Sequence, residues 1–164
     1  AARIAGARIP DPDELAAALW DIVPDGAVDP AAATAVRALR GRGHVLVLAC
    51  NTRRSLASRQ QTLAAAGIEG CFAALVLSSE LGAAKPDPRF YAAVLAAAHE
   101  HAGCGPGGVV FAGDTPAKDA AGPVRAGMRA ALIHPGPGAP EGLPAGIPVL
   151  GHLSGLPGLL ERWP

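Results

Sequence analysis

Two carboxylates follow one apolar segment at a spacing that could do chemistry. Asp114 comes directly after the run Val109–Gly113, and Asp119 lies five positions further along. A short apolar run bounded by glycine is typical of a buried parallel strand, and in open α/β sheets ligands bind beyond the carboxyl ends of such strands. Carboxylates together with phosphate oxygens are the ligands that Mg²⁺ prefers. The pattern predicts a phosphate-associated magnesium site, and the alternative is a solvated acidic turn, since this spacing is common.

Length and charge limit the classes of function. The chain has 164 residues, enough for one domain with its own core, and half of its residues are hydrophobic but only 4% are aromatic. The 14 basic and 14 acidic side chains give a formal net charge of zero. This balance provides no electrostatic basis for binding nucleic acid or an anionic membrane, so we expect neither as a partner.

The cysteines and the hydropathy pattern indicate a cytoplasmic protein. The three cysteines, Cys50, Cys71 and Cys104, are an odd number without metal-binding spacing. They are expected to be reduced thiols rather than a disulfide framework. No apolar run approaches the roughly 18 residues of a membrane span, and no signal peptide is evident.

Helix and strand patterns alternate along the chain and must position the two acids. Asp-Pro pairs at 29–30 and 87–88 are typical helix starts, and Gly67 is a typical helix stop. Strands alternating with helices of this length predict an α/β protein with a parallel sheet. The expected helices are 14–20, 30–40, 54–66, 89–101, 120–126 and 153–161, the expected strands are 44–49, 73–77, 109–113 and 129–133, and 135–148 is expected to be a loop.

Three segments in order resemble motifs of the haloacid dehalogenase-like (HAD) hydrolases. Residues 46–52 (LVLACNT) resemble the second motif, residues 81–91 (LGAAKPDPRFY) the third, and residues 113–128 (GDTPAKDAAGPVRAGM) the fourth. The tail, residues 146–160, also resembles the end of these proteins, so that the resemblance covers roughly residues 18 to 162. It implies a three-layer Rossmann-like parallel sheet with flanking helices. In this interpretation residues 1–22 are the remnant of a largely absent helical cap, and residues 23–164 form the core.

The resemblance implies a role for each motif residue. Lys85 matches the lysine that neutralises the nucleophilic carboxylate and the phosphoryl group, and the alternative is an ordinary surface lysine before a helix cap. Asp114 and Asp119 match the acids that bind Mg²⁺, which offsets charge in the transition state. Cys50 stands where the family has a Ser or Thr that binds the phosphoryl group, and a thiol is a weak donor. Asn51 is expected to contribute its backbone N–H to the substrate.

The first motif of the family has no match in this chain. That motif is an apolar strand followed by D-x-D-G-T, in which the first Asp attacks phosphorus and the second is general acid and base. Asp11-Pro12-Asp13 is the nearest pattern, but no apolar strand precedes it, and it is better interpreted as a helix cap. We therefore expect this chain to begin after the nucleophile, to be inactive or nearly so alone, and to bind Mg²⁺ weakly or not at all.

Three functional hypotheses remain open at this stage. The first is one part of a Mg²⁺-dependent phosphatase that acts on a small phosphorylated molecule. The second is a non-catalytic relative that serves as a binding or interaction module. The third is an enzyme with a different nucleophile, for which Cys50 is the local candidate. A cysteine phosphatase is excluded, because its loop needs Arg six positions after Cys, where this chain has Leu56.

The missing motif also has a consequence for the sheet. In the family the first-motif strand is central and lies between the strand that ends at Cys50 and the strand that ends at Asp114. Unpaired backbone groups cost about 1–3 kcal/mol each when buried, so a whole strand edge should find a partner. The two strands could pair directly, a foreign segment could insert, or a second copy could donate an edge. We expect a homodimer or a complex with the missing N-terminal segment.

Overall fold

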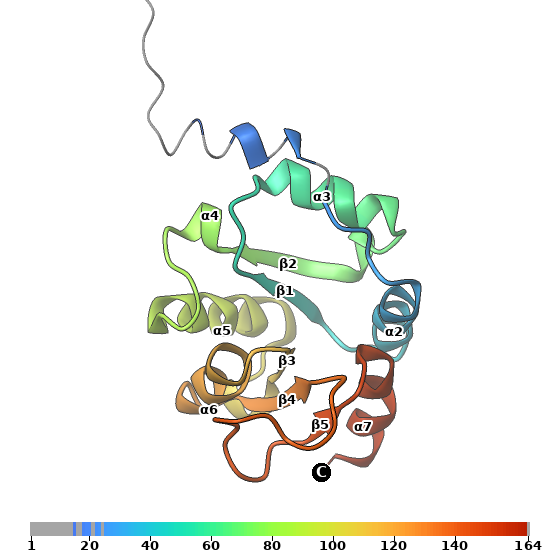
Figure 1. Ribbon diagram of the computed structural model, residues 1–164, viewed down its shortest axis with the longest axis vertical. Coiled ribbons are helices and arrows are strands. Elements are labelled where there is room, and N and C mark those ends of the chain that lie inside the picture. The colour runs from blue at the N-terminus through green and yellow to red at the C-terminus, as the bar shows by residue number, and fades with distance from the viewer. Residues whose placement is uncertain (1–14, 16–17, 21, 24, 164) are drawn as a thin grey trace, which may run out of the picture.

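The strands of the protein are parallel and alternate with helices, as the sequence predicts (Figure 1). A computed structural model describes residues 15, 18–20, 22–23 and 25–163. Its strands are β1 (Leu46–Cys50), β2 (Phe72–Leu77), β3 (Val110–Gly113), β4 (Arg129–Ile133) and β5 (Val149–Leu150). The expected α/β Rossmann-like fold is confirmed.

The helices begin and end at residues with clear capping roles. Asp29 accepts hydrogen bonds from the backbone N–H groups of Ala31 and Ala32, and Asp87 accepts one from Arg89, as the Asp-Pro pairs predict. Gly103 ends the longest helix with a left-handed backbone (φ 65°). The helices are α2 (Pro30–Gly41), α3 (Leu56–Ala65), α4 (Ser78–Leu81), α5 (Pro88–Ala102), α6 (Gly122–Arg125) and α7 (Leu156–Arg162), with short 3₁₀ turns at Glu69–Cys71, Pro106–Gly108 and Leu153–Gly155.

Most differences from the sequence prediction are shifts of one or two residues at the ends of elements. The expected helix 120–126 is a larger correction, because a π-helix, Pro116–Ala121, precedes a short α6. The two-residue strand β5 and the helix α4 were not predicted, since segments this short leave little periodic pattern. Of the expected helix 14–20, residues 15 and 18–20 are described and are helical, whereas the acids Asp11 and Asp13 and most of the cap remnant 1–22 lie outside the described residues.

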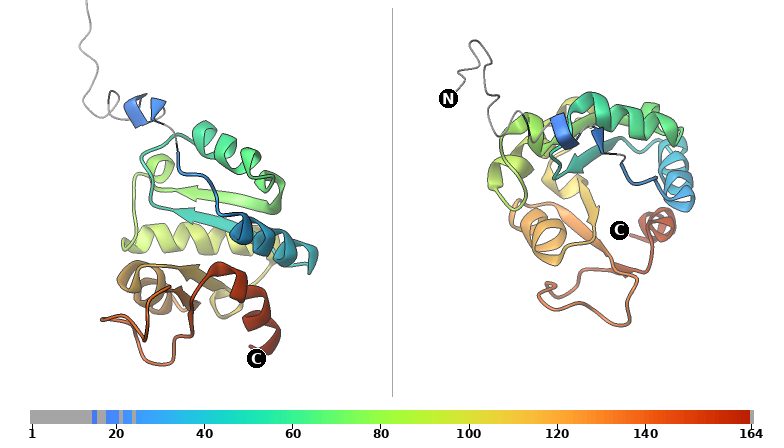
Figure 2. Two further views of the ribbon diagram at one scale, coloured as in Figure 1. Left: turned by 45° about the vertical axis from the view of Figure 1, so that its right-hand side comes forward. Right: turned by 45° about the horizontal axis from the view of Figure 1, so that its top comes forward.

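The strands form two separate parallel sheets. One sheet has the order β1-β2 and the other has the order β3-β4-β5 (Figures 1 and 2). Direct pairing of β1 with β3 was one of three ways in which the edges could be closed, and it does not occur in the described part of the chain. Within the described residues, β1 and β3 line the same cavity of about 820 Å³ without backbone pairing between them.

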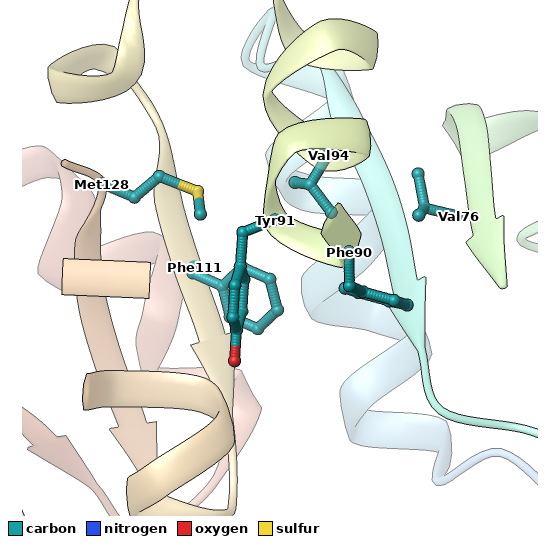
Figure 3. Close-up of a cluster of buried hydrophobic side chains, with 6 residues drawn as sticks. All are labelled: Val76, Phe90, Tyr91, Val94, Phe111 and Met128. Atoms are coloured by element: carbon teal, nitrogen blue, oxygen red, sulfur yellow. The ribbon is translucent and has the colours of Figure 1, made fainter. Parts of the chain in front are cut away.

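Helices cover both faces and join the two sheets. On one face, Phe90, Tyr91 and Val94 of α5 pack with Val76 from β2 and with Phe111 and Met128 beyond the gap (Figure 3). On the other face, Leu39 of α2 and Leu156 of α7 pack with Leu46 of β1, with Val110 and Ala112 of β3, and with Ala131 of β4. Side chains alternate between these faces along each strand, which gives the three layers expected for the family.

No helix in the described residues is long and apolar enough to cross a membrane. The three cysteines are free thiols, as their number and spacing predict.

The role of α5 in holding the sheets together leads to a stability prediction. Phe90 is fully buried in the cluster that joins them, so Phe90→Ala should lower the free energy of unfolding by about 3–5 kcal/mol. Leu81 is 40% exposed, and Leu81→Ala is the control, expected to change stability by less than about 0.5 kcal/mol. Urea unfolding followed by circular dichroism measures both. Equal losses would mean that α5 does not join the sheets.

Candidate functional site

The ammonium group of Lys85 lies between the carboxyl ends of the two sheets. Its Nζ donates to the carbonyl oxygen of Ala49 in β1 at 3.2 Å and to Oδ1 of Asp119, which follows β3, at 2.8 Å. The two charged side chains are only 10% and 5% exposed. The alternative of an ordinary surface lysine is therefore wrong, and the third and fourth sequence motifs meet here.

Asn51 fixes the backbone of Lys85 from the end of β1. Its side-chain oxygen accepts from the Lys85 N–H at 2.8 Å, and its amide nitrogen donates to the Lys85 carbonyl at 3.0 Å. The sequence predicts a role for the backbone N–H of Asn51, whereas the structure shows that its side chain positions the backbone of Lys85. Cys50 is partly buried, and its thiol donates to the Asn51 carbonyl at 3.6 Å.

Asp119 organises the loop that follows β3. Its Oδ2 accepts from the backbone N–H groups of Asp114, at 3.1 Å, and Thr115, at 2.9 Å, while Oδ1 binds Lys85. Both oxygens of this buried carboxylate are thus engaged. A side chain at position 113 would collide with the Asp119 carboxyl group, which explains the glycine before Asp114.

Asp114 differs from Asp119 in its surroundings. It is exposed, and its Oδ1 accepts a hydrogen bond from the Thr115 hydroxyl at 3.0 Å. Its other carboxylate oxygen has no hydrogen bond within the described residues. No group of three or more His, Cys, Asp or Glu that could hold a metal ion occurs in the part of the chain that the structure describes.

Aromatic rings form the inner wall around Lys85. Its Nζ lies 5.1 Å from the ring centre of Phe111 and 5.8 Å from that of Phe90, within the range of cation–π attraction. The Tyr91 hydroxyl donates to the Lys118 carbonyl at 2.7 Å and so holds the π-helix. Burial, followed by the negative charge of Asp119, raises the pKa of Tyr91 above its ordinary value. The neutral phenol therefore remains a hydrogen-bond donor at neutral pH.

A second polar cluster next to the site was not predicted. Asp25 pairs with Arg59 at 2.8 Å and with Arg54 at 3.3 Å, and it accepts from the Thr62 hydroxyl at 2.9 Å. Burial opposes ionisation of Asp25, but Thr62, Arg59 and Arg54 outweigh it and hold the pKa of the carboxyl below its usual range. Arg54 also donates to the carbonyls of Trp20 and Val23, so this cluster anchors the segment that precedes α2. A lone acid and two dispersed arginines offer no sequence signal for such pairing.

Comparison with known proteins identifies the family. Residues 5–127 match the haloacid dehalogenase-like hydrolases. The chain belongs to this family. The match covers most of the chain and contains the three motifs that meet at Lys85.

Relatives of this HAD hydrolase include enzymes of known type. It is 36% identical over 107 residues to a phosphoserine phosphatase of Thermus thermophilus, which covers 64% of this chain and 41% of the relative. Among solved structures, an L-2-haloacid dehalogenase from Xanthobacter autotrophicus has a TM-score of 0.69 at 22% identity, covering 94% of this chain and 69% of that one. A HAD phosphatase from Thermococcus onnurineus has a TM-score of 0.64 at 21% identity, and the match covers 77% of this chain and 55% of that one. At these identities the two structures support the fold alone, and this chain spans less than half of the Thermus relative.

The ion pair between Lys85 and Asp119 leads to a prediction. Lys85→Met leaves a buried carboxylate without its cation and should lower stability by about 3 kcal/mol or more. Asp119→Asn retains an acceptor for the backbone N–H groups, so a cycle with the double variant should give a coupling of about 1–3 kcal/mol.

Arg42→Met, which breaks the exposed Arg42–Glu161 pair, is the control and should cost less than about 0.5 kcal/mol. Denaturant unfolding measures each variant. A Lys85→Met loss no larger than that of the control would contradict the assigned role of the ion pair.

Proposed function

We propose that this HAD hydrolase carries the phosphate-binding part of a Mg²⁺-dependent phosphatase-type site, and that it lacks the nucleophile. The observation that supports the proposal most directly is the placement of Lys85, whose ammonium group lies between the carboxyl ends of β1 and β3. A buried cation there would neutralise a phosphoryl group that enters at this edge of the sheets. A small phosphorylated molecule is the substrate class we propose, in keeping with the phosphoserine phosphatase relative.

The donor set fits Mg²⁺ in part. Asp114 is exposed and keeps one carboxylate oxygen free of hydrogen bonds within the described residues, so it is the residue that would hold the ion. Asp119 uses both oxygens for Lys85 and the loop backbone, which favours a positioning role over direct ligation. When bound, Mg²⁺ would offset charge on the phosphoryl oxygens. With a single available carboxylate, the ion would be weakly held, because Mg²⁺ gives up its waters reluctantly.

The proposed lack of a nucleophile is supported by the carboxylate and thiol groups that the described residues place near Lys85. Among the described residues, its carboxylate contact is Asp119, which is held on both oxygens and cannot turn toward a substrate. Cys50, at the end of β1, is another nucleophilic side chain in this region of the described residues, but its thiol donates to the neighbouring Asn51 carbonyl. A non-catalytic binding module is the second candidate function, and the same inventory favours it.

The metal assignment can be tested with two isosteric variants. Asp114→Asn should abolish the weak Mg²⁺ binding, because it removes the available carboxylate, whereas Asp119→Asn should reduce it less. Isothermal calorimetry with MgCl₂ measures both, and circular dichroism checks that each variant is folded. Tight stoichiometric binding by the unaltered chain, or equal losses in the two variants, would contradict the assignment.

The proposed absence of a nucleophile predicts no appreciable hydrolysis by this chain alone. With p-nitrophenyl phosphate and excess MgCl₂, release of p-nitrophenol should not exceed that of the Asp114→Asn variant purified in parallel. Turnover that persists through purification and disappears in Asp114→Asn would contradict the proposal. It would also support a replacement nucleophile, which Cys50→Ala would then identify.

A further inference from the structure

The π-helix that carries Asp119 leaves one backbone carbonyl without a regular helical donor. The N–H of Gly122 donates to the Ala117 carbonyl, five residues earlier, as the π register requires. In an α-helix the same N–H would donate to the Lys118 carbonyl. The donor that the π register assigns to Lys118 is residue 123, but Pro123 has no N–H. The Lys118 carbonyl therefore needs a hydrogen-bond donor from another part of the chain.

Tyr91, which belongs to the third sequence motif, provides this donor. Its hydroxyl donates to the Lys118 carbonyl at 2.7 Å. The residue is only 2% exposed, and its ring packs edge-to-face against that of Phe111, with the ring centres 6.1 Å apart (Figure 3). A buried phenol needs a hydrogen-bond partner, so the hydroxyl and the carbonyl satisfy each other.

Gly122 makes room for this contact. A Cβ atom at position 122 would collide with the hydroxyl and with ring carbons of Tyr91. The backbone of Gly122 is ordinary helix (φ −62°), so its conformation does not require glycine. Glycine is unfavourable within a helix, and the close approach of the Tyr91 ring explains why it occurs here.

A single peptide unit transmits the contact to Asp119. The Lys118 carbonyl and the Asp119 N–H belong to the same planar unit. Tyr91 holds the oxygen of this unit, and the Thr115 carbonyl accepts from its N–H at 2.7 Å. Both ends of the unit are therefore fixed, and with them the Cα atom from which the Asp119 carboxylate extends.

We propose that Tyr91 is a positioning residue of the site at the carboxyl edge, and that it sets the Asp119 carboxylate through the peptide unit of Lys118 and Asp119. Lys85 and Tyr91 lie six positions apart in the same motif. The Lys85 ammonium group binds the carboxylate of Asp119 at 2.8 Å, and the Tyr91 hydroxyl holds the backbone that carries it. One motif thus fixes Asp119 through both its side chain and its main chain.

Tyr91 acts through Asp119 and not on a substrate. It is almost completely buried, and its hydroxyl is already used by the Lys118 carbonyl. The Asp119 carboxylate accepts from the backbone N–H groups of Asp114 and Thr115, so its placement also sets this loop. An effect on Mg²⁺ held by Asp114 rests on the proposed function, whereas the placement of the loop does not.

The test removes the hydroxyl alone. In Tyr91→Phe the peptide unit loses one of its two anchors, so the hydrogen bonds that Asp119 accepts should weaken. The amide protons of Asp114 and Thr115, followed by NMR in the folded protein, should then shift upfield, because their bonds to a carboxylate are charge-assisted. Calorimetry with MgCl₂ should show binding about tenfold weaker than that of the unaltered chain, as is typical when a group that orients a metal site is removed.

Thr62→Val is the matched control. It also deletes one partly buried hydroxyl donor, which binds Asp25 at 2.9 Å in the separate cluster beside α3. It should lower stability by a similar amount and leave the amide shifts of Asp114 and Thr115 unchanged. Urea unfolding followed by circular dichroism compares the stabilities of the two variants.

A loss of stability in Tyr91→Phe without these amide shifts would mean that Tyr91 serves the core alone, and it would overturn the proposal. Equal shifts in Thr62→Val would overturn it as well, since the response would then be a general one. Shifts confined to Tyr91→Phe support the proposal whatever the metal does. If they occur while Mg²⁺ binding is unchanged, or absent from the unaltered chain, Tyr91 positions Asp119 and the metal assignment of the proposed function fails by itself.

Discussion

One ammonium group connects the two halves of this protein at the edge where chemistry is expected. Lys85 Nζ binds the Ala49 carbonyl at the end of β1 and the Asp119 carboxylate beyond β3. Asp119 in turn binds the backbone N–H groups of Asp114 and Thr115, and Asn51 holds the Lys85 backbone. Both charges are buried, so each needs the other: removing either partner would leave the remaining charge uncompensated in a poorly solvated site. The positions of all three sequence motifs therefore depend on this ion pair.

The same region shows why the two sheets keep their spacing although no strand in the described part of the chain joins them. Hydrophobic clusters from α5 on one face and from α2 and α7 on the other contact both sheets. Burial of these side chains is favourable wherever they are placed, but the backbone edges of β1 and β3 need directional partners. The helices can fix the distance between the edges, yet they cannot provide those partners. In the described residues, hydrophobic layers therefore hold the two sheets at their distance, without hydrogen bonds between β1 and β3.

Much of the fold could be predicted from the sequence, because its elements have strong local signals. Asp29 and Asp87 before proline mark helix starts, and the apolar run before Asp114 marks a strand, so these elements are found close to their expected positions. Lys85, Asp114 and Asp119 could be selected from motif spacing, and the structure brings them together. The π-helix at Pro116–Ala121 and the cluster around Asp25 could not be predicted, since both depend on contacts between distant segments. Asn51 could be selected from its place in the second motif, but the sequence could not predict that its side chain would bind the Lys85 backbone.

The placement of Asp119 clarifies what a complete site would require. A carboxylate that serves as nucleophile must be free to approach the substrate, and a carboxylate that orients a loop must be fixed. Asp119 is fixed by three hydrogen bonds, and Asp114 is exposed on the neighbouring loop. At the carboxyl edge of the sheets, the Lys85 ammonium group lies between the end of β1 and the loop that follows β3. Under the proposed function, a nucleophilic carboxylate would have to lie beside this cation, because Lys85 would neutralise both the carboxylate and the phosphoryl group there.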